Sequence, residues 1–239
     1  MIGLPALALP SDPRHGPLPA VLLMLTAVTG VVDALSYLTL GHVFVANMTG
    51  NVVFLGFAAG GAKGFSVVAS LTATVAFLAG ALLGGKITSR FSAHRARHLN
   101  AALSVELALV GCALVLAVAL PAEQKSYGDD GLLIALGLAM GLQNATARRL
   151  GVPDLTTTVL TLTLTGLASD SRLAGGSGGN AGRRMTSVAC MFAGAAAGTA
   201  IVRRYPVSHA LALMLLLLAL AYLVTRQAAR STEDWTKGS

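Results

Sequence analysis

Charged residues are scarce in this chain of 239 residues, where Asp, Glu, Lys and Arg together make up 11%. A typical soluble domain carries about 25%. Hydrophobic residues make up 54% of the chain, and its mean hydropathy is +0.72. So few charges cannot cover a water-soluble globule of this size. The composition therefore excludes a soluble enzyme, a disordered tail and a secreted disulfide scaffold, and it indicates an integral membrane protein.

Cysteines and metal-ligand patterns are equally scarce. The two cysteines, Cys112 and Cys190, each lie within an apolar run, which favours small buried hydrophobic residues over a disulfide or a metal pair. The five histidines show no ligand spacing, so we expect no metal and no other cofactor. Intramembrane-protease motifs, a nucleophile beside a base and a phosphate-binding loop are also missing from the sequence. We therefore expect a protein that is not an enzyme.

Acidic residues are fewer than basic ones, which gives a net charge of +7. The basic residues lie between long apolar runs, with no basic stripe or aromatic platform of the kind that binds nucleic acid. We therefore expect no nucleic-acid partner and assign the excess to the loops of a protein embedded in a lipid bilayer.

Six apolar segments are close to the roughly 17–25 residues that a membrane-spanning helix needs. They are 19–40, 64–85, 100–121, 131–147, 185–202 and 207–225. Two further stretches, 43–60 and 155–168, are apolar but rich in Gly, Asn and Thr. Each of these is either a full span or a re-entrant segment.

The distribution of Lys and Arg favours six spans. With both stretches re-entrant and both termini cytoplasmic, 13 basic residues lie inside and four outside, namely Lys63, Lys125, Arg203 and Arg204. Eight spans would leave 8 inside and 9 outside. Because basic loops stay cytoplasmic, we predict six membrane-spanning helices.

The predicted organisation has two membrane halves. It comprises a flexible N-terminal lead-in (1–18), a first membrane repeat (19–121), an external loop (122–130), a second membrane repeat (131–225) and a cytoplasmic tail (226–239).

The two halves resemble each other in sequence. Gly30–Ala34 aligns with Gly141–Ala145 at an offset of 111, and Phe77–Gly84 aligns with Met191–Gly198 at an offset of 114. With three spans in each half, the second half enters the membrane from the opposite side. We therefore predict an all-α fold of two inverted three-helix repeats, each with a broken or re-entrant segment. Secondary transporters use such inverted repeats and place their sites at the interrupted segments.

Glycines four residues apart mark corresponding places in both halves, at Gly80 and Gly84 and at Gly194 and Gly198. Small residues at this spacing let membrane helices approach closely. We expect these two helices to cross each other or equivalent partners, and the motifs also permit a homodimer.

Asp33 lies inside the first predicted span, where a charged Asp costs about 2.5–3.5 kcal/mol. No Lys or Arg lies within a predicted span to pair with it. Two interpretations stay open: a carboxylate that couples transport to a proton or cation, and a neutral structural acid bonded to neighbouring backbone.

Polar residues in the interrupted segments are the other candidates for a solute or ion site. Asn47, Thr49 and Asn51 either line a site or break a helix. Gln143 and Asn144 occupy the position that corresponds to Asp33, and they either line a site or join helices. The hydroxyl of Thr161 completes the set.

Two further acidic residues have simpler explanations. Asp154 follows a proline and precedes threonines, which favours the N-terminal cap of a helix. Glu106 lies about two turns into its span, so we expect its long side chain to reach the basic loop or the membrane surface.

The segments Gly30–Tyr37 (GVVDALSY) and Gly41–Asn51 (GHVFVANMTGN) resemble the YoaK-like family of bacterial membrane proteins. A second resemblance lies in Gly141–Ala145 (GLQNA) and Arg148–Gly151 (RRLG), and the similarity extends over nearly the whole chain. The family is one of unknown function. The resemblance implies a small inner-membrane protein with several spans. It does not imply any particular reaction or substrate.

The combined expectation is a multi-pass inner-membrane protein that acts as a secondary transporter or permease for a small solute, coupled to a proton or cation. Asp33 would be the coupling carboxylate. The alternative is a membrane scaffold, or a lipid- or partner-binding protein, that transports nothing.

Overall fold

The computed structural model describes residues 14–91, 93–120, 125–229 and 233–237, which form helices and loops with no strand among them. The predicted lead-in lies largely outside this range. The α-helices are α1 (Leu18–Thr39), α2 (Met48–Ala59), α3 (Val67–Phe91), α4 (Arg95–Ala119), α5 (Lys125–Leu150), α6 (Leu160–Ser169), α7 (Ala181–Val202) and α8 (Val207–Ala228). Two short 3-10 turns are η2 (Arg172–Ala174) and η3 (Asp234–Thr236).

Six of these helices are long, and five of them (α1, α3, α4, α7 and α8) are long and apolar enough to cross a membrane. The sixth, α5, has 26 residues but is less apolar, because it carries amides and several charges. It begins at Lys125, so the second part of the predicted external loop 122–130 is helical. The chain is therefore an α-helical membrane protein whose long helices coincide with the six predicted segments.

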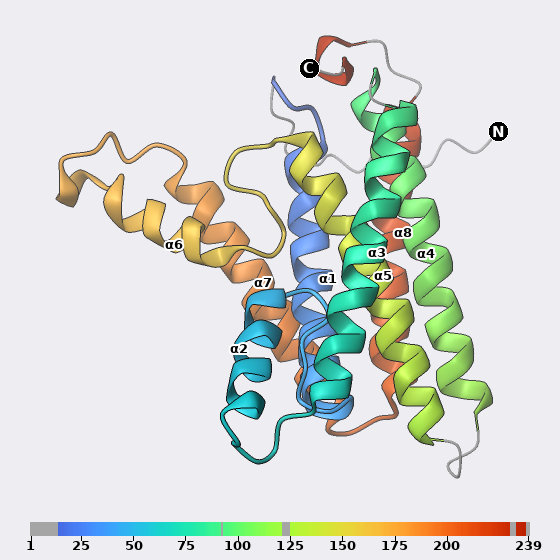
Figure 1. Cartoon of the computed structure of the whole chain (residues 1–239). Helices are drawn as coiled ribbons and strands as arrows, with labels where there is room; N and C mark the ends of the chain where they lie inside the picture. The colour runs from blue at the N-terminus through green and yellow to red at the C-terminus, as the bar shows by residue number, and fades with distance from the viewer. Residues whose placement is uncertain (1–13, 92, 121–124, 230–232, 238–239) are drawn as a thin grey trace.

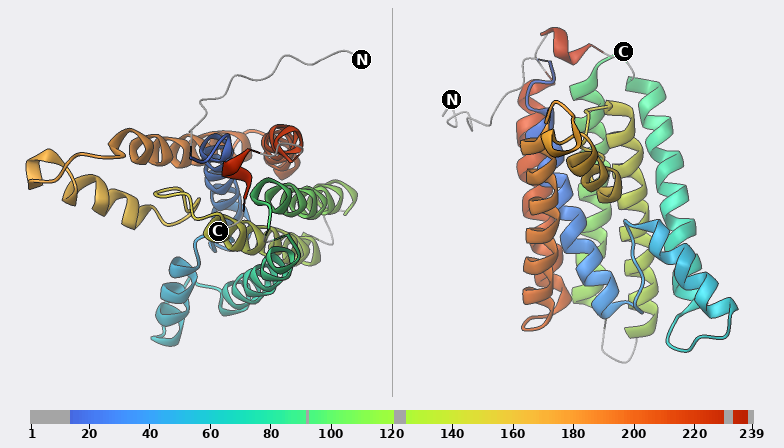
Figure 2. Two further views of the ribbon diagram at one scale, coloured as in Figure 1. Left: turned by 90° about the horizontal axis from the view of Figure 1, so that it is seen from above. Right: turned by 90° about the vertical axis from the view of Figure 1, so that its left-hand side faces the viewer.

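The two remaining α-helices are too short to cross a bilayer. At 1.5 Å per residue, the 12 residues of α2 and the 10 of α6 cover about 18 Å and 15 Å, against about 30 Å of hydrocarbon. Figure 1 shows that α2 begins within the length of the bundle and runs back towards the end at which α1 ends. In the same way, α6 runs outward and back towards the end at which α5 ends (Figures 1 and 2).

The long helices pack in a defined set of pairs. α1 packs against α7 and α8, and α5 packs against α3 and α4. α4 also packs against α8, whereas α2 lies on α3 and α6 lies on α7. Fully buried side chains from α1, α4, α5 and α8 form the centre, among them Leu22, Leu103, Leu136 and Met214. Figure 2 shows α6 and the start of α7 projecting from this bundle.

Glycines set the closest helix crossings. A Cβ on Gly80 would collide with the backbone of Leu138 in α5, and one on Gly194 would collide with the backbone of Ala27 in α1. Gly84 and Gly198 face the same two partner helices. The two glycine-bearing helices therefore cross corresponding partners and not each other, which is one of the two predicted outcomes. Both glycine faces are covered by helices of the same chain.

Candidate functional site

The carboxylate of Asp33 holds the loop between α1 and α2. Its side chain is buried, with 6% of the residue exposed. The backbone N–H of Ala46 donates a hydrogen bond to Oδ1 over 3.0 Å, and the side-chain amide of Asn47 donates to Oδ2. These two donors satisfy both carboxylate oxygens just before α2 begins, so Asp33 fixes where the chain turns back into the bundle.

Asn51, one turn into α2, closes the same loop from the other side. Its Oδ1 accepts from the backbone N–H of Phe44 over 2.9 Å, and its Nδ2 donates to the Phe44 carbonyl over 2.6 Å. The amide is fully buried and replaces backbone hydrogen bonds that a broken helix leaves unmade. Asn47 and Asn51 therefore both serve the loop, whereas Thr49 is exposed.

Aromatic rings cover this first loop. Tyr37 stacks on Phe44 with ring centroids 5.1 Å apart, and Phe44 stacks on Phe54 at 5.8 Å. Phe57 and Phe65 continue the cluster along α2 and into the next loop. Sequence reasoning missed this cluster, although four of the seven phenylalanines lie between residues 44 and 65.

The second half repeats the Asp33 arrangement with neutral groups. Asn144 in α5 accepts a hydrogen bond from Thr158 Oγ1 over 2.6 Å, and its own amide donates to the Met140 carbonyl over 2.9 Å. The interval from Asn144 to Thr158 is 14 residues, as it is from Asp33 to Asn47. The two tethers thus join each loop to the long helix before it, but only the first holds a carboxylate.

Gln143 joins the two halves. Its Nε2 donates to Thr29 Oγ1 in α1 over 2.9 Å and to Thr157 Oγ1 over 3.3 Å. Thr29 lies one turn before Asp33 on the same helix. The other amide atom, Oε1, is buried without a hydrogen-bond partner. Gln143 therefore links α1, α5 and the second loop, and its Oε1 is available to accept a further hydrogen bond.

The structure divides the candidate residues into two groups and leaves two outside them. Asp33, Asn47 and Asn51 surround the first loop, and Gln143 and Asn144 hold the second. Thr49 and Thr161 are exposed in the first turns of α2 and α6. Thr157 and Thr158, in the threonine-rich second segment, and Thr29, which sequence reasoning overlooked, complete the polar contacts.

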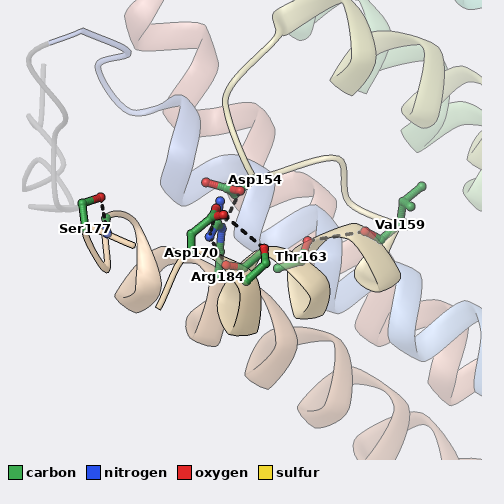
Figure 3. A network of polar contacts seen from close by, with 9 residues as sticks. Asp154, Val159, Thr163, Asp170, Ser177 and Arg184 are labelled. Carbon is green, nitrogen blue, oxygen red and sulfur yellow. Dashed lines mark hydrogen bonds and ion pairs between the residues drawn. The ribbon is translucent and has the colours of Figure 1, made fainter. Parts of the chain in front are cut away.

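Asp154 does not cap a helix, because α6 begins after Val159. It has a left-handed backbone (φ 65°) and accepts from Arg184 Nε over 2.7 Å. Figure 3 shows Arg184 between Asp154 and Asp170, whose Oδ2 is 2.8 Å from Nη1. Hydrogen bonding from Arg184 lowers the pKa of Asp170. This network fastens α6 and its loops to the start of α7.

Glu106 is buried in α4 and does not reach the membrane surface as expected, since 1% of it is exposed. Its Oε1 has no hydrogen-bond partner among the residues that the structure describes. The buried residues nearest to it on its own helix, Leu103 and Val110, are apolar. The helix pairing explains this, because α5 and α8 cover the face of α4 that carries Glu106.

Within the described residues, no three His, Cys, Asp or Glu side chains come together in a way that could hold a metal ion. The groups that tether the two loops to the preceding helices are amides, hydroxyls and the carboxylate of Asp33, while the carboxylate of Asp154 in the second loop is paired with Arg184. Such groups bind polar solutes and small cations more readily than transition metals.

A family of proteins of unknown function, DUF1275, matches residues 21–224. The chain belongs to this family. It is also 38% identical over 149 residues to the UPF0700 transmembrane protein YoaK of Bacillus subtilis (strain 168). That alignment covers 62% of this chain and 64% of the relative, so the chain spans under two thirds of the relative's length. No solved structure matches the chain.

Membership establishes a multi-pass membrane protein and confirms the family resemblance. It assigns no substrate to the DUF1275 fold. The features of the chain that bear on its function are the two loops, their tethers and the helices that hold them.

Proposed function

We propose that the protein is a secondary transporter or permease of the inner membrane that moves a small polar solute, coupled to a proton or cation. The observation that carries this proposal is the pair of broken segments. Each consists of a polar loop and a short helix, tied to the preceding long helix by a hydrogen bond across 14 residues. Irregular backbone at membrane depth is tolerated where it is buried in protein or lines a water-filled cavity.

An inverted repeat is part of the proposal, and the helix pairing supports it. Exchanging α1 with α5 and α3 with α7 converts the pair α1–α7 into α5–α3, and both pairs are present. When α2 is also exchanged with α6, the pair α2–α3 becomes α6–α7, and both of these pairs are present as well. Figure 1 shows α1 and α5 running in opposite directions along the bundle. Two halves that enter from opposite sides would give a solute two gates around one site.

In this proposal Asp33 is the coupling group. A proton or cation on its carboxylate weakens its hydrogen bonds with Ala46 N–H and the Asn47 amide, because both donors prefer an ionised acceptor. The loop before α2 is then free to shift. The neutral tether at Asn144 and Thr158 does not respond in this way, so only the first gate senses the ion.

The test is flux through reconstituted protein. Proteoliposomes carrying an internal pH dye are offered amino acids, sugars and organic acids, with and without a sodium gradient. We expect one class to be taken up by the wild-type chain and Asp33→Asn to abolish its coupled uptake while the protein stays folded in detergent. Asp234→Asn, in the exposed C-terminal segment, is the matched control. Unchanged uptake by Asp33→Asn would remove Asp33 from the mechanism.

The second candidate function is a scaffold or partner-binding protein without transport. The observation that favours it is that Asp33, Asn51 and Asn144 all bond to neighbouring loops or backbone, as structural residues do. In that case Asp33→Asn lowers thermal stability or alters assembly, and no solute class shows uptake by the wild-type chain.

The remaining expectations stay proposals of the same kind: cytoplasmic termini, no enzymatic activity, no nucleic-acid partner and a homodimer. Because Gly80 and Gly194 face helices of their own chain, a homodimer would use other surfaces.

A further inference from the structure

A groove of about 600 Å³ runs along the outer face of α7. Small side chains form its floor, and two arginines stand at one end. Its lining is Phe192, Ala195, Ala196, Thr199, Ala200, Arg203 and Arg204. The arginine end lies where α7 meets α8, at the end of the bundle at which α1 ends (Figure 1).

The two arginines provide positive charge that no ion pair neutralises within the part of the chain that the structure describes. Arg203 and Arg204 are exposed. Tyr205 follows directly and stacks on His209 with ring centroids 5.2 Å apart. Arginine beside tyrosine at the end of a membrane helix is typical of the level of lipid headgroups.

The corresponding face of α3 carries a hollow of similar size, about 670 Å³, lined by Leu78, Ala81, Leu82, Gly85, Lys86 and Ser89. Aligned by Gly80 and Gly194, Phe192 and Ala196 correspond to Leu78 and Leu82, and Arg203 corresponds to Ser89. Leu82 is large and 72% exposed, as is usual for a residue facing mobile lipid. The two faces therefore differ in the placement of charge: α7 carries two adjacent arginines at one end, where α3 has Ser89 and Arg90, and Lys86 lies where α7 has Ala200.

We propose that this groove binds one anionic phospholipid, with an acyl chain along the alanines and the phosphate on Arg203 and Arg204. Charge complementarity selects the ligand, because guanidinium groups bind phosphate oxygens in bidentate pairs and basic pockets on membrane helices hold acidic headgroups. In the six-span arrangement, Arg203 and Arg204 lie on the outer side of the membrane, where few other Lys and Arg residues are expected. Binding of an acidic headgroup accounts for a basic pair on that side.

The test is native mass spectrometry of the full chain, stripped of lipid in detergent and mixed with equal amounts of phosphatidylglycerol and phosphatidylcholine that carry identical acyl chains. We expect one phosphatidylglycerol molecule to be retained in preference to phosphatidylcholine. The double variant Arg203→Gln/Arg204→Gln should retain it at least about tenfold less, because each basic group near a lipid surface contributes on the order of a fivefold gain.

The control is Lys86→Gln/Arg90→Gln on the matched face of α3, where we expect less than about a twofold change. Equal losses in the two double variants would overturn the proposal, because they would reflect net charge and not this groove. Equal retention of the two lipids by the wild-type chain would overturn it as well. All four side chains in the double variants are exposed, so the substitutions leave the packed core intact.

Discussion

Asp33 and Asn51 hydrogen-bond to backbone groups of the loop between α1 and α2, which offsets the cost of placing polar side chains in hydrocarbon. Asp33, Asn47 and Asn51 could be selected because polar groups are costly in hydrocarbon and rare in this chain. Their partners could not be selected, because those are mostly backbone groups of Val45 to Asn47 and of Phe44. Backbone has no sequence signature, and only the turn between α1 and α2 brings it within reach of the side chains.

For Glu106, too, the surroundings of the side chain could not be predicted from the sequence. Its position about two turns into the span predicts that the Glu106 side chain reaches the basic loop. Only the pairing of α4 with α5 and α8 places this side chain in the core. A buried carboxyl oxygen without a partner costs about 1–3 kcal/mol or more.

We therefore expect Glu106→Leu to raise the midpoint of thermal unfolding in detergent by several degrees, because a chain of this size gains about 2–4 °C per kcal/mol. Circular dichroism at 222 nm or differential scanning fluorimetry measures the change. Glu106→Gln keeps a polar group at the site and should gain much less. A fall in the midpoint for Glu106→Leu would mean that the carboxyl group has a stabilising partner in the membrane.

Among the helices, the approximate positions of the six long ones could be predicted from the sequence, but only part of their pairing could. Apolar runs with few charges marked the six long helices, and the aligned glycines marked close crossings. Which helix each glycine faces was left open, because the spacing of Gly194 and Gly198 is compatible with any neighbouring backbone. The helix α5 begins at Lys125, before the apolar run that the sequence shows, because a helix can continue beyond the apolar residues and the acidic residues Asp129 and Asp130 mark only where that run ends.

The glycine crossings predict opposite effects for one substitution at two places. Gly194→Ala puts a methyl group into the backbone of Ala27 and should lower the free energy of unfolding by about 1–3 kcal/mol, the usual cost of overpacking. Gly85→Ala has open space around the new Cβ and should raise helix stability by about 0.5–1 kcal/mol. Unfolding midpoints of the two variants, measured in one detergent, check both signs. Equal effects would mean that Gly194 does not set the distance between α1 and α7.

For the whole molecule, membrane class and helix content followed directly from composition, whereas the paths of α2 and α6 did not. Their apolar sequences are compatible with full spans and with re-entrant segments. The structure makes both helices too short to cross, and Figure 1 shows each returning to the end from which its loop entered. The loops following α2 and α6 therefore lie towards opposite ends of the helix bundle, and we expect them on opposite sides of the membrane.

Single cysteines at Gly61 and Gly179 test this consequence, in a chain with Cys112 and Cys190 replaced by serine. Both glycines are exposed in loops, after α2 and before α7 respectively. With six crossings and a cytoplasmic N-terminus, an impermeant maleimide added to intact cells should label Gly61→Cys and spare Gly179→Cys until the membrane is opened.

The opposite result has an equally definite meaning. Eight crossings that keep the basic Lys86–Arg97 segment cytoplasmic put both cysteines outside, so labelling of both in intact cells would mean that α2 and α6 cross the bilayer. The two halves would then contain four spans each and enter from the same side, because an even number of crossings returns the chain to where it began. An inverted repeat needs an odd number of membrane crossings in each half. Labelling of both cysteines would therefore rule out the inverted repeat and remove the argument for two gates.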